Sequence, residues 1–183
     1  MNQEGKVCGA KVIDHIGSAT FDVKAKVVVN ASGPWVDVLR KEDQSLHGKR
    51  LQLTKGVHIV FPFEKFPIQQ AAYFDVGDGR MIFAIPRNGI TYLGTTDTVY
   101  NEEIDHPVCN RADVEYLLKA VNSVFASLNL KESDIVSSWA GLRPLIQEDG
   151  KSPGELSRKD EIFISRSGLI SIAGGKLTGY RLM

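Results

Sequence analysis

Length, composition and charge limit what this chain can be. It has 183 residues, of which 43% are hydrophobic, so it is long enough and apolar enough to build a folded core. Its 22 basic and 22 acidic side chains cancel to a formal net charge of zero, which excludes a global attraction to nucleic acid or to an anionic membrane. Any anion must therefore be recognised by a local cluster of side chains.

Cysteine usage and apolar runs exclude further classes. The two cysteines, Cys8 and Cys109, lie far apart without CxxC spacing, so neither a disulfide framework nor a metal site is expected. No run approaches the ~18 consecutive apolar residues of a membrane span, and the first residues lack the apolar core of a signal peptide. The sequon at Asn30 follows an apolar run, so we expect a strand end there and not a glycosylation site. These features favour a cytoplasmic protein.

The first part of the chain predicts two strands and a short helix. Residues 7–14 and 20–29 have strand character, and the run Val27-Val28-Val29 predicts that the second strand ends in a buried position. The turn at 30–35 breaks this strand and leads into the helical stretch. The polar segment 41–50 then marks a boundary between two lobes.

The middle of the chain predicts an antiparallel sheet covered by a helix. Strands are expected at 57–61 and 81–85, and Asn88-Gly89 is a strong hairpin signal because both residues tolerate positive φ angles. Asn110 is expected to cap a helix that runs to about Leu128, since its apolar residues recur at helical spacing.

The last part predicts a strand, a hairpin and the start of a helix. The strand covers 135–139 and the hairpin 162–173. Gly174-Gly175 ends the hairpin, and Lys176-Leu177-Thr178 is expected to open a helix that the chain end at Met183 leaves incomplete. The fold class expected is α+β, with a mixed or antiparallel sheet lobe covered by a helix and part of a second, α/β lobe.

Several segments, in this order, carry a resemblance to a known family. The chain resembles the FAD-dependent, aerobic and quinone-linked glycerol-3-phosphate dehydrogenases over nearly its whole length. The segments that carry it are Val29-Asn30-Ala31-Ser32-Gly33-Pro34-Trp35, Lys55-Gly56-Val57-His58-Ile59-Val60, Leu93-Gly94-Thr95-Thr96-Asp97, Gly141-Leu142-Arg143-Pro144-Leu145 and Gly174-Gly175-Lys176-Leu177-Thr178-Gly179-Tyr180-Arg181.

The resemblance implies an organisation and an activity. Residues 1–48 would be part of an FAD-binding domain of the glutathione-reductase or D-amino-acid-oxidase-like type, 49–146 a substrate-binding cap, and 147–183 the return segment of the FAD-binding domain. The parent protein would oxidise sn-glycerol 3-phosphate to dihydroxyacetone phosphate, passing hydride to FAD and electrons to a quinone. A peripheral contact with the inner face of the cell membrane follows from the quinone.

Two segments are implied as cofactor contacts. A strand that ends in a small-residue turn lets backbone N–H groups approach a cofactor, and a helix start after Gly-Gly presents N–H donors to an anion or a flavin carbonyl. Outside the resemblance, these segments are simply tight connections. The residues are Asn30, Ala31, Ser32, Gly33, Pro34, Trp35, Gly174, Gly175, Lys176, Leu177 and Thr178.

Four side chains are candidates for the substrate site. Arg143 lies among apolar neighbours, where an arginine needs an anionic partner, and its donor fork suits a phosphate. The alternative is an internal salt bridge with a residue such as Asp97 or Glu148. Lys176 and, by resemblance, Arg158 would complete a phosphate clamp.

His58 is the candidate general base. In a strand its imidazole would face away from its apolar neighbours Val57 and Ile59, and its ordinary pKa of about 6.5 suits it to accept the hydroxyl proton of an alcohol substrate. A hydrogen-bonded structural histidine is the alternative. His58, Arg143 and Lys176 form the expected catalytic set.

One expected motif is missing. Flavoproteins of this type bind the FAD pyrophosphate through a GxGxxG turn, and none occurs in this chain. We therefore expect a fragment that lacks the N-terminal FAD-binding motif, holds no FAD by itself and is inactive alone. A related flavin-dependent amine or amino-acid oxidase, with Arg143 clamping a carboxylate, and a non-catalytic substrate-binding fragment are the alternatives.

Overall fold

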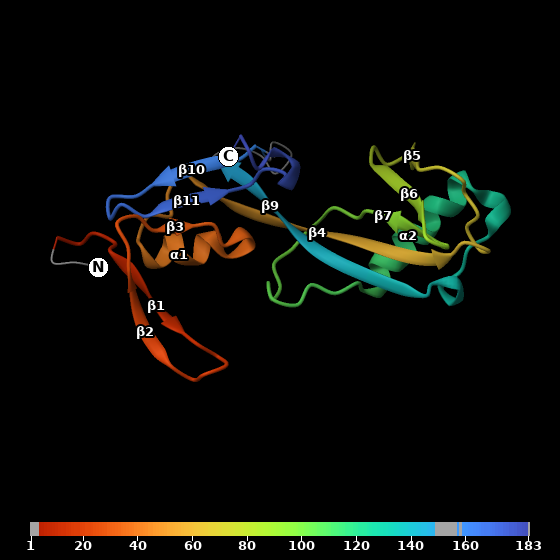
Figure 1. Ribbon diagram of the computed structural model, residues 1–183. Helices are drawn as coiled ribbons and strands as arrows, with labels where there is room; N and C mark the ends of the chain where they lie inside the picture. Colours follow the sequence, from red (N-terminus) through yellow and green to blue (C-terminus); the bar gives the residue numbers. More distant parts are fainter. Residues whose placement is uncertain (1–3, 149–156, 158, 183) are drawn as a thin grey trace. The chain divides into compact units, whose positions relative to one another are not determined.

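The computed structural model describes residues 4–148, 157 and 159–182, which form two compact units (Figure 1). Unit 1 combines the residues up to Leu53 with those from Pro144 onward, and unit 2 is the continuous stretch Thr54–Arg143. The chain leaves unit 1 within strand β4 (Lys49–Pro62) and returns to it within strand β9 (Ser137–Glu148). The functions that the resemblance assigns to the lobes remain predictions.

The described part of unit 1 contains two small sheets and the short α-helix α1. Strands β1 and β2 form an antiparallel hairpin, and β10, β11 and β3 form a second sheet in that order. Within this sheet β11 runs antiparallel to β10 and parallel to β3, so both expected hairpins of this unit are present. The elements are β1 (Gly9–Ile13), β2 (Thr20–Lys24), β3 (Val29–Asn30), α1 (Val36–Glu42), β10 (Glu161–Ile164) and β11 (Ile170–Ala173).

The single strand expected at 20–29 is wrong. The chain leaves the hairpin after Lys24 and enters the other sheet only at Val29. Val27 and Val29 are more than half exposed, so the valine run is not the buried strand end that its composition predicts. The reason is topological: β3 lies at the end of its sheet and has one neighbouring strand, β11, among the described residues.

A small core joins α1 to the sheet of unit 1. Val36, Ile146 and Ala173 are buried together. Arg40 is also buried: its guanidinium lies 3.9 Å from the ring centroid of Phe163 and donates to Asp37 at 2.8 Å. The positive charge of Arg40 is therefore paired within unit 1.

Unit 2 is built on one antiparallel sheet. The sheet has the strand order β5, β6, β7, β4, β8, and β9 pairs with β4. Asn88 and Gly89 link β6 to β7 with φ angles of +49° and +79°, which confirms the hairpin expected there. The remaining elements of this unit are β5 (Ala72–Asp75), β6 (Met81–Arg87), β7 (Ile90–Gly94), β8 (Thr98–Val99) and α2 (Arg111–Val124).

Helix α2 covers one face of this sheet. Its buried residues Leu117, Ala120 and Val121 join the core formed by the inward side chains of the strands. Asn110 caps the helix as expected, with its side chain accepting from the Asp113 N–H at 3.0 Å. The α+β fold class is thus confirmed.

Two element ends differ from the expectation. The helix ends at Val124 and not near Leu128, because Phe125 leaves the helical region and packs edge-on against Phe66 and Phe74. Strand β9 continues past Trp139 to Glu148, through Arg143. Tertiary packing therefore decides both ends.

An ion pair is buried beside the helix N-terminus. Lys55 on β4 donates to Asp113 at 2.6 Å and to the Val108 carbonyl at 3.1 Å, and both charged side chains are less than a tenth exposed. Since Asp113 also belongs to the cap of α2, this pair ties the helix to the central strand of the sheet.

Candidate functional site

His58 lies on the sheet face opposite the core of unit 2. Its neighbours in β4, Val57 and Ile59, are fully buried, whereas the imidazole is half-buried on the other face, as the strand alternation predicts. Trp139 stacks on it with ring centroids 4.8 Å apart and an angle of 13° between the planes. Tyr92 approaches edge-on at 6.1 Å. The histidine is thus fixed by aromatic neighbours and not by core packing.

The surroundings of His58 favour its neutral form. Burial of the ring lowers the pKa of His58 below its ordinary value, and the positive charge of Arg143 lowers it further. A neutral imidazole at pH 7 carries the free electron pair that a proton acceptor needs.

Arg143 lies in β9 and reaches the turn that follows β7. Its Nη2 donates to the Thr95 hydroxyl at 2.9 Å, and its Nη1 donates to the Thr96 carbonyl at 3.2 Å. A longer contact of 3.4 Å joins Nη1 to Asp97, so the salt bridge weighed as the alternative is present. The side chain keeps 30% of its surface exposed, which leaves it within reach of an anion from solution.

Two glycines make room for these side chains. A Cβ on Gly94 would lie 2.4 Å from His58 Cδ2, and a Cβ on Gly56 would lie 2.3 Å from Arg143 Nη2. Only glycine allows the imidazole and the guanidinium to approach the backbone so closely. Gly94, the last residue of β7, lies against His58, and the next residue, Thr95, accepts a hydrogen bond from Arg143, so the end of this strand lies beside both side chains.

The predicted cofactor segments of unit 1 follow two neighbouring parallel strands. Asn30 ends β3, Ser171 lies beside it on β11, and the turns 30–35 and 174–178 continue from these strands. The carboxyl ends of adjacent parallel strands meet at one sheet edge, where ligands of open α/β sheets bind. The two segments therefore share an edge.

Asn30 is the buried centre of the first segment. Its amide donates to the Val36 carbonyl at 2.9 Å and to the Ser171 hydroxyl at 3.2 Å, and its oxygen accepts from the Ser32 hydroxyl at 2.7 Å. Gly33 adopts a φ of +60° with open space where a Cβ would stand. Ala31 and Trp35 are exposed, while Ser32, Gly33 and Pro34 are half-buried. This turn leaves surface for a ligand.

The second segment forms a short 3₁₀ turn in place of the expected helix. Gly174 and Gly175 both adopt a φ of +75°, and a Cβ on Gly174 would lie 2.4 Å from the Lys159 carbonyl oxygen. Lys176 is itself extended, with a φ of −112° and a ψ of 143°, so the helix expected from this residue does not form. Lys176 precedes the 3₁₀ helix Leu177–Gly179 and is exposed, as are Leu177 and Thr178.

The donor set of unit 1 fits a flavin. Two turns that contain glycines, the side chain of Leu177, which is 89% exposed, and the exposed indole of Trp35 would offer polar and apolar contacts to a flat heterocycle. Lys176 belongs to this unit, and its part in substrate binding remains a prediction. Arg158, the remaining candidate, lies outside the described residues.

Three contributors to the site escape sequence reasoning. Trp139, Thr95 and Gly56 contact His58 or Arg143 across strands that are far apart in the chain. The resemblance includes Thr95 and Gly56 in its segments, which is a signal of importance but not of role. Trp139 lies two residues before Gly141, and its stacking partner is visible only in the folded sheet.

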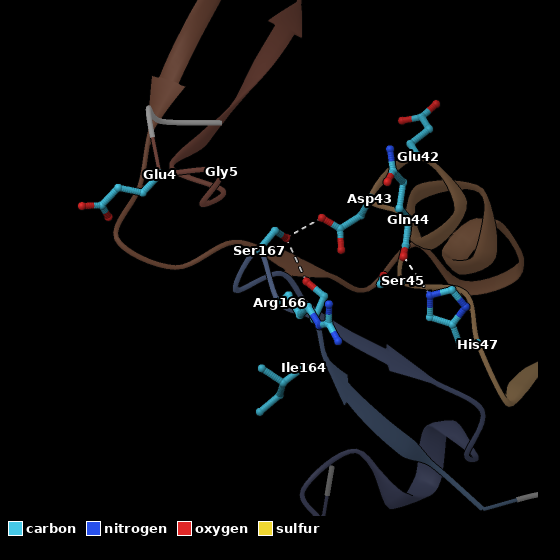
Figure 2. Close-up of a pocket in the computed structure, with 11 residues that line it drawn as sticks. Glu4, Gly5, Glu42, Asp43, Gln44, Ser45, His47, Ile164, Arg166 and Ser167 are labelled. Atoms are coloured by element: carbon cyan, nitrogen blue, oxygen red, sulfur yellow. Dashed lines mark hydrogen bonds between the residues drawn. The ribbon is translucent and has the colours of Figure 1, made fainter.

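A pocket of unit 1 lies away from all predicted site residues (Figure 2). Asp43 and Ser167 hydrogen-bond across it, and hydrogen bonds from Ser167, Ser165 and Ser45 lower the pKa of Asp43, although burial alone would raise it. These bonds join the end of α1 to the β10–β11 turn. The pocket has a volume of about 670 Å³ and is lined by Glu4, Gly5, Glu42, Asp43, Gln44, Ser45, His47, Ile164, Ser165, Arg166 and Ser167.

Comparison with known proteins defines the class. The family model described as FAD dependent oxidoreductase (DAO) matches residues 3–181. The chain therefore belongs to the FAD dependent oxidoreductase family.

The relatives narrow this further. The aerobic glycerol-3-phosphate dehydrogenase of Bacillus subtilis is 58% identical over 99% of the chain, and that of Staphylococcus haemolyticus is 54% identical over the whole chain. These matches confirm the resemblance found in the sequence. The chain spans about a third of the length of these relatives, 33% of each.

Solved structures agree. The glycerol-3-phosphate dehydrogenase of Bacillus halodurans complexed with FAD is 55% identical, with a TM-score of 0.89 over 100% of this chain and 35% of its own. An L-proline dehydrogenase from P. horikoshii, with a TM-score of 0.67 over 98% of this chain and 44% of its own, is 15% identical and shows the fold alone.

Among the described residues, no helix combines the length and apolar character needed to cross a bilayer.

Proposed function

We propose that this chain is the substrate-binding and flavin-contacting part of an FAD-dependent glycerol-3-phosphate dehydrogenase. The observation that carries the proposal is the turn after β7, where Gly94 touches His58 and Thr95 binds Arg143. In this proposal His58 is the proton acceptor and Arg143 the anion-binding cation, the two groups that oxidation of a phosphorylated alcohol requires. The similarity to glycerol-3-phosphate dehydrogenases supports the same substrate.

Arg143 is proposed to bind the substrate phosphate. Its contact with Asp97 is long and its side chain is partly exposed, so a phosphate can take the place of the carboxylate on the guanidinium. Lys176 and, by resemblance, Arg158 remain the other candidates for binding the phosphate. A dianion favours convergent basic groups more strongly than the single charge of an amino-acid carboxylate.

His58 is proposed to take the hydroxyl proton. Oxidation of sn-glycerol 3-phosphate removes a hydride from the carbinol carbon and a proton from its hydroxyl, leaving dihydroxyacetone phosphate. FAD, when bound, supplies the hydride acceptor. The residues that would hold it are those of the turns 30–35 and 174–178, and the imidazole needs only to remain neutral and oriented.

The acceptor of the electrons and the cellular location follow from the same proposal. A quinone is the acceptor that the resemblance implies, and a peripheral position at the inner face of the cell membrane would bring the enzyme to it.

The test uses the full-length, flavin-loaded protein that contains this chain. Dye reduction is measured with glycerol 3-phosphate, glycine and proline as substrates. We expect activity with glycerol 3-phosphate alone, a KM at least about 100-fold higher in Arg143→Ala, and partial recovery in Arg143→Lys. Oxidation of an amino acid in place of glycerol 3-phosphate, or an unchanged KM in Arg143→Ala, would overturn the proposal.

A further inference from the structure

The imidazole of His58 is held between two neighbours on the open face of the sheet. Gly94 on β7 lies so close to the ring that even a methyl group there would meet Cδ2 at 2.4 Å. Trp139 on β9 lies parallel to the ring, with 4.8 Å between the centroids. Tyr92 closes a third side, 6.1 Å from His58 and 5.5 Å from Trp139. Gly94, Tyr92 and Trp139 thus form a narrow slot that restricts the orientation of the imidazole.

Trp139 is not part of the hydrophobic core of unit 2. It keeps 45% of its surface exposed, although tryptophan is among the side chains that gain most from burial. It also shares a face of β9 with Arg143, because residues four apart in a strand point the same way. Its large apolar surface thus packs on the rings of His58 and Tyr92.

The two ring nitrogens of His58 have different surroundings in this slot. Nδ1 of His58 is buried, and no group in the described part of the chain hydrogen-bonds to it. A buried nitrogen without a hydrogen-bond partner costs free energy, which favours a rotation of the ring that brings this nitrogen to water. A contact that resists this turn is therefore needed, and it leaves Nε2 as the nitrogen that a substrate can reach.

We infer that Trp139 is a positioning residue that holds the imidazole of His58 with Nε2 directed to the substrate hydroxyl. The inference rests on the proposed function, in which His58 accepts the hydroxyl proton. Trp139 acts through His58 and touches no reacting atom. The flat indole of Trp139 fixes the plane of the imidazole, and the close backbone of Gly94 limits the space on another side of the ring.

Charged and ionisable side chains around the slot also affect the pKa of His58. Arg143 on β9 lowers the pKa of His58, and burial lowers it more. Asp97, after β7, pairs with Arg143 and moderates its charge. Tyr92 is the ionisable side chain that faces the ring from β7. Removing Trp139 leaves the charges of Arg143 and Asp97 in place, so its effect on the pKa of His58 reports hydration and orientation of the ring.

The test is a histidine titration by NMR on the full-length protein that contains this chain, with ¹⁵N-labelled imidazoles, which reports the tautomer and the pKa of His58. In Trp139→Ala we expect mixed tautomer signals and a pKa that rises toward the ordinary value of about 6.5. Trp139→Phe keeps a flat ring and is expected to retain the native signals. Tyr73→Ala is the matched control, since Tyr73 is also exposed, stacked and in the same sheet, but packs on Phe83.

Trp139→Leu guards against a loss of fold in the alanine variant, because leucine keeps apolar bulk but offers no flat face. It is expected to behave like Trp139→Ala. Native His58 signals in folded Trp139→Leu, or equal changes in Tyr73→Ala, would overturn the inference.

Kinetics of the full-length protein separate this inference from the proposed function. Trp139→Leu is expected to lower kcat roughly 10-fold or more with little change in KM, and Trp139→Phe much less. The expected NMR changes in a protein that does not oxidise glycerol 3-phosphate would keep the positioning role and reject the function. Full activity with native His58 signals in Trp139→Leu would reject the positioning role alone.

Discussion

The side-chain amide of Asn30 donates to the hydroxyl of Ser171 at 3.2 Å and joins two parallel strands that lie 141 residues apart in the chain. The same amide donates to Val36, and its oxygen accepts from Ser32. One buried side chain thus shapes the turn 30–35 and ties it to β11, the strand that leads to the turn 174–178.

Replacement of Asn30 is expected to destabilise unit 1. Asn30→Ala removes several buried hydrogen bonds at once and should lower the free energy of unfolding by about 1–3 kcal/mol. Ser171→Ala removes one of them and should lower it by about 1 kcal/mol or less. Urea titration of both variants checks the order. Equal losses would show that the Asn30 contacts to Val36 and Ser32 contribute nothing.

Gly56 is expected to matter for substrate binding and not for folding. In Gly56→Ala the new Cβ meets the end of the flexible Arg143 side chain, which moves away at little loss of stability. The KM for glycerol 3-phosphate in the full-length protein should rise roughly 10-fold, because charged hydrogen bonds contribute about 1.5–3 kcal/mol. Gly141→Ala in the same strand as Arg143 is the control, since its Cβ would meet nothing within 4 Å. Equal kinetics for the two variants would contradict the expectation.

The stability of the chain should depend on pH through His58. Burial and Arg143 lower the pKa of His58 in the folded chain, so at acidic pH the unfolded chain binds the proton more readily. The contribution to stability is complete above about pH 6.5 and is lost as the pH falls toward the folded pKa. Urea midpoints at about pH 7 and pH 5 measure this difference, and His58→Gln should reduce it.

The share of Arg143 in this effect can be separated. Arg143→Gln removes the charge and should raise the pKa of His58, whereas Arg143→Lys keeps the charge and should leave it low. An NMR titration of His58 distinguishes the two variants. If Gln and Lys gave the same pKa, burial alone would account for the shift.

The buried pair of Lys55 and Asp113 should be the most sensitive ion pair of unit 2. Lys55→Met leaves a buried carboxylate without its cation and is expected to cost about 3–5 kcal/mol, measured by urea unfolding. The double variant Lys55→Met with Asp113→Leu should recover much of the loss. Arg111→Ala, which breaks the exposed pair with Glu115, should have no measurable effect. A loss in the double variant as large as in Lys55→Met would contradict this.

Local signals predicted the local parts of the fold. The hairpin at Asn88-Gly89 and the cap at Asn110 follow from the conformational preferences of those residues, and both are present. The run Val27-Val28-Val29 misled because hydrophobicity predicts burial, whereas exposure depends on the place of the strand in its sheet. The end of α2 was misplaced because Phe125 is decided by packing against other elements.

The candidate site divides in the same way. The orientation of His58 follows from strand alternation, and its two neighbours Val57 and Ile59 confirm it. The roles of Gly94 and Trp139 depend on which strands lie side by side, and no pattern in one sequence gives strand order. The resemblance pointed to the residues, while the folded sheet shows what they touch.

The insertion of unit 2 between the two halves of unit 1 has a consequence for synthesis on the ribosome. All of Thr54–Arg143 is made before β11, the partner of β3, leaves the ribosome. The antiparallel sheet of unit 2 can therefore form before β3 has its neighbour β11, and the edge shared by the turns 30–35 and 174–178 is completed only after unit 2 has been made. A stall in translation before residue 170 would leave Asn30 without Ser171 to bind.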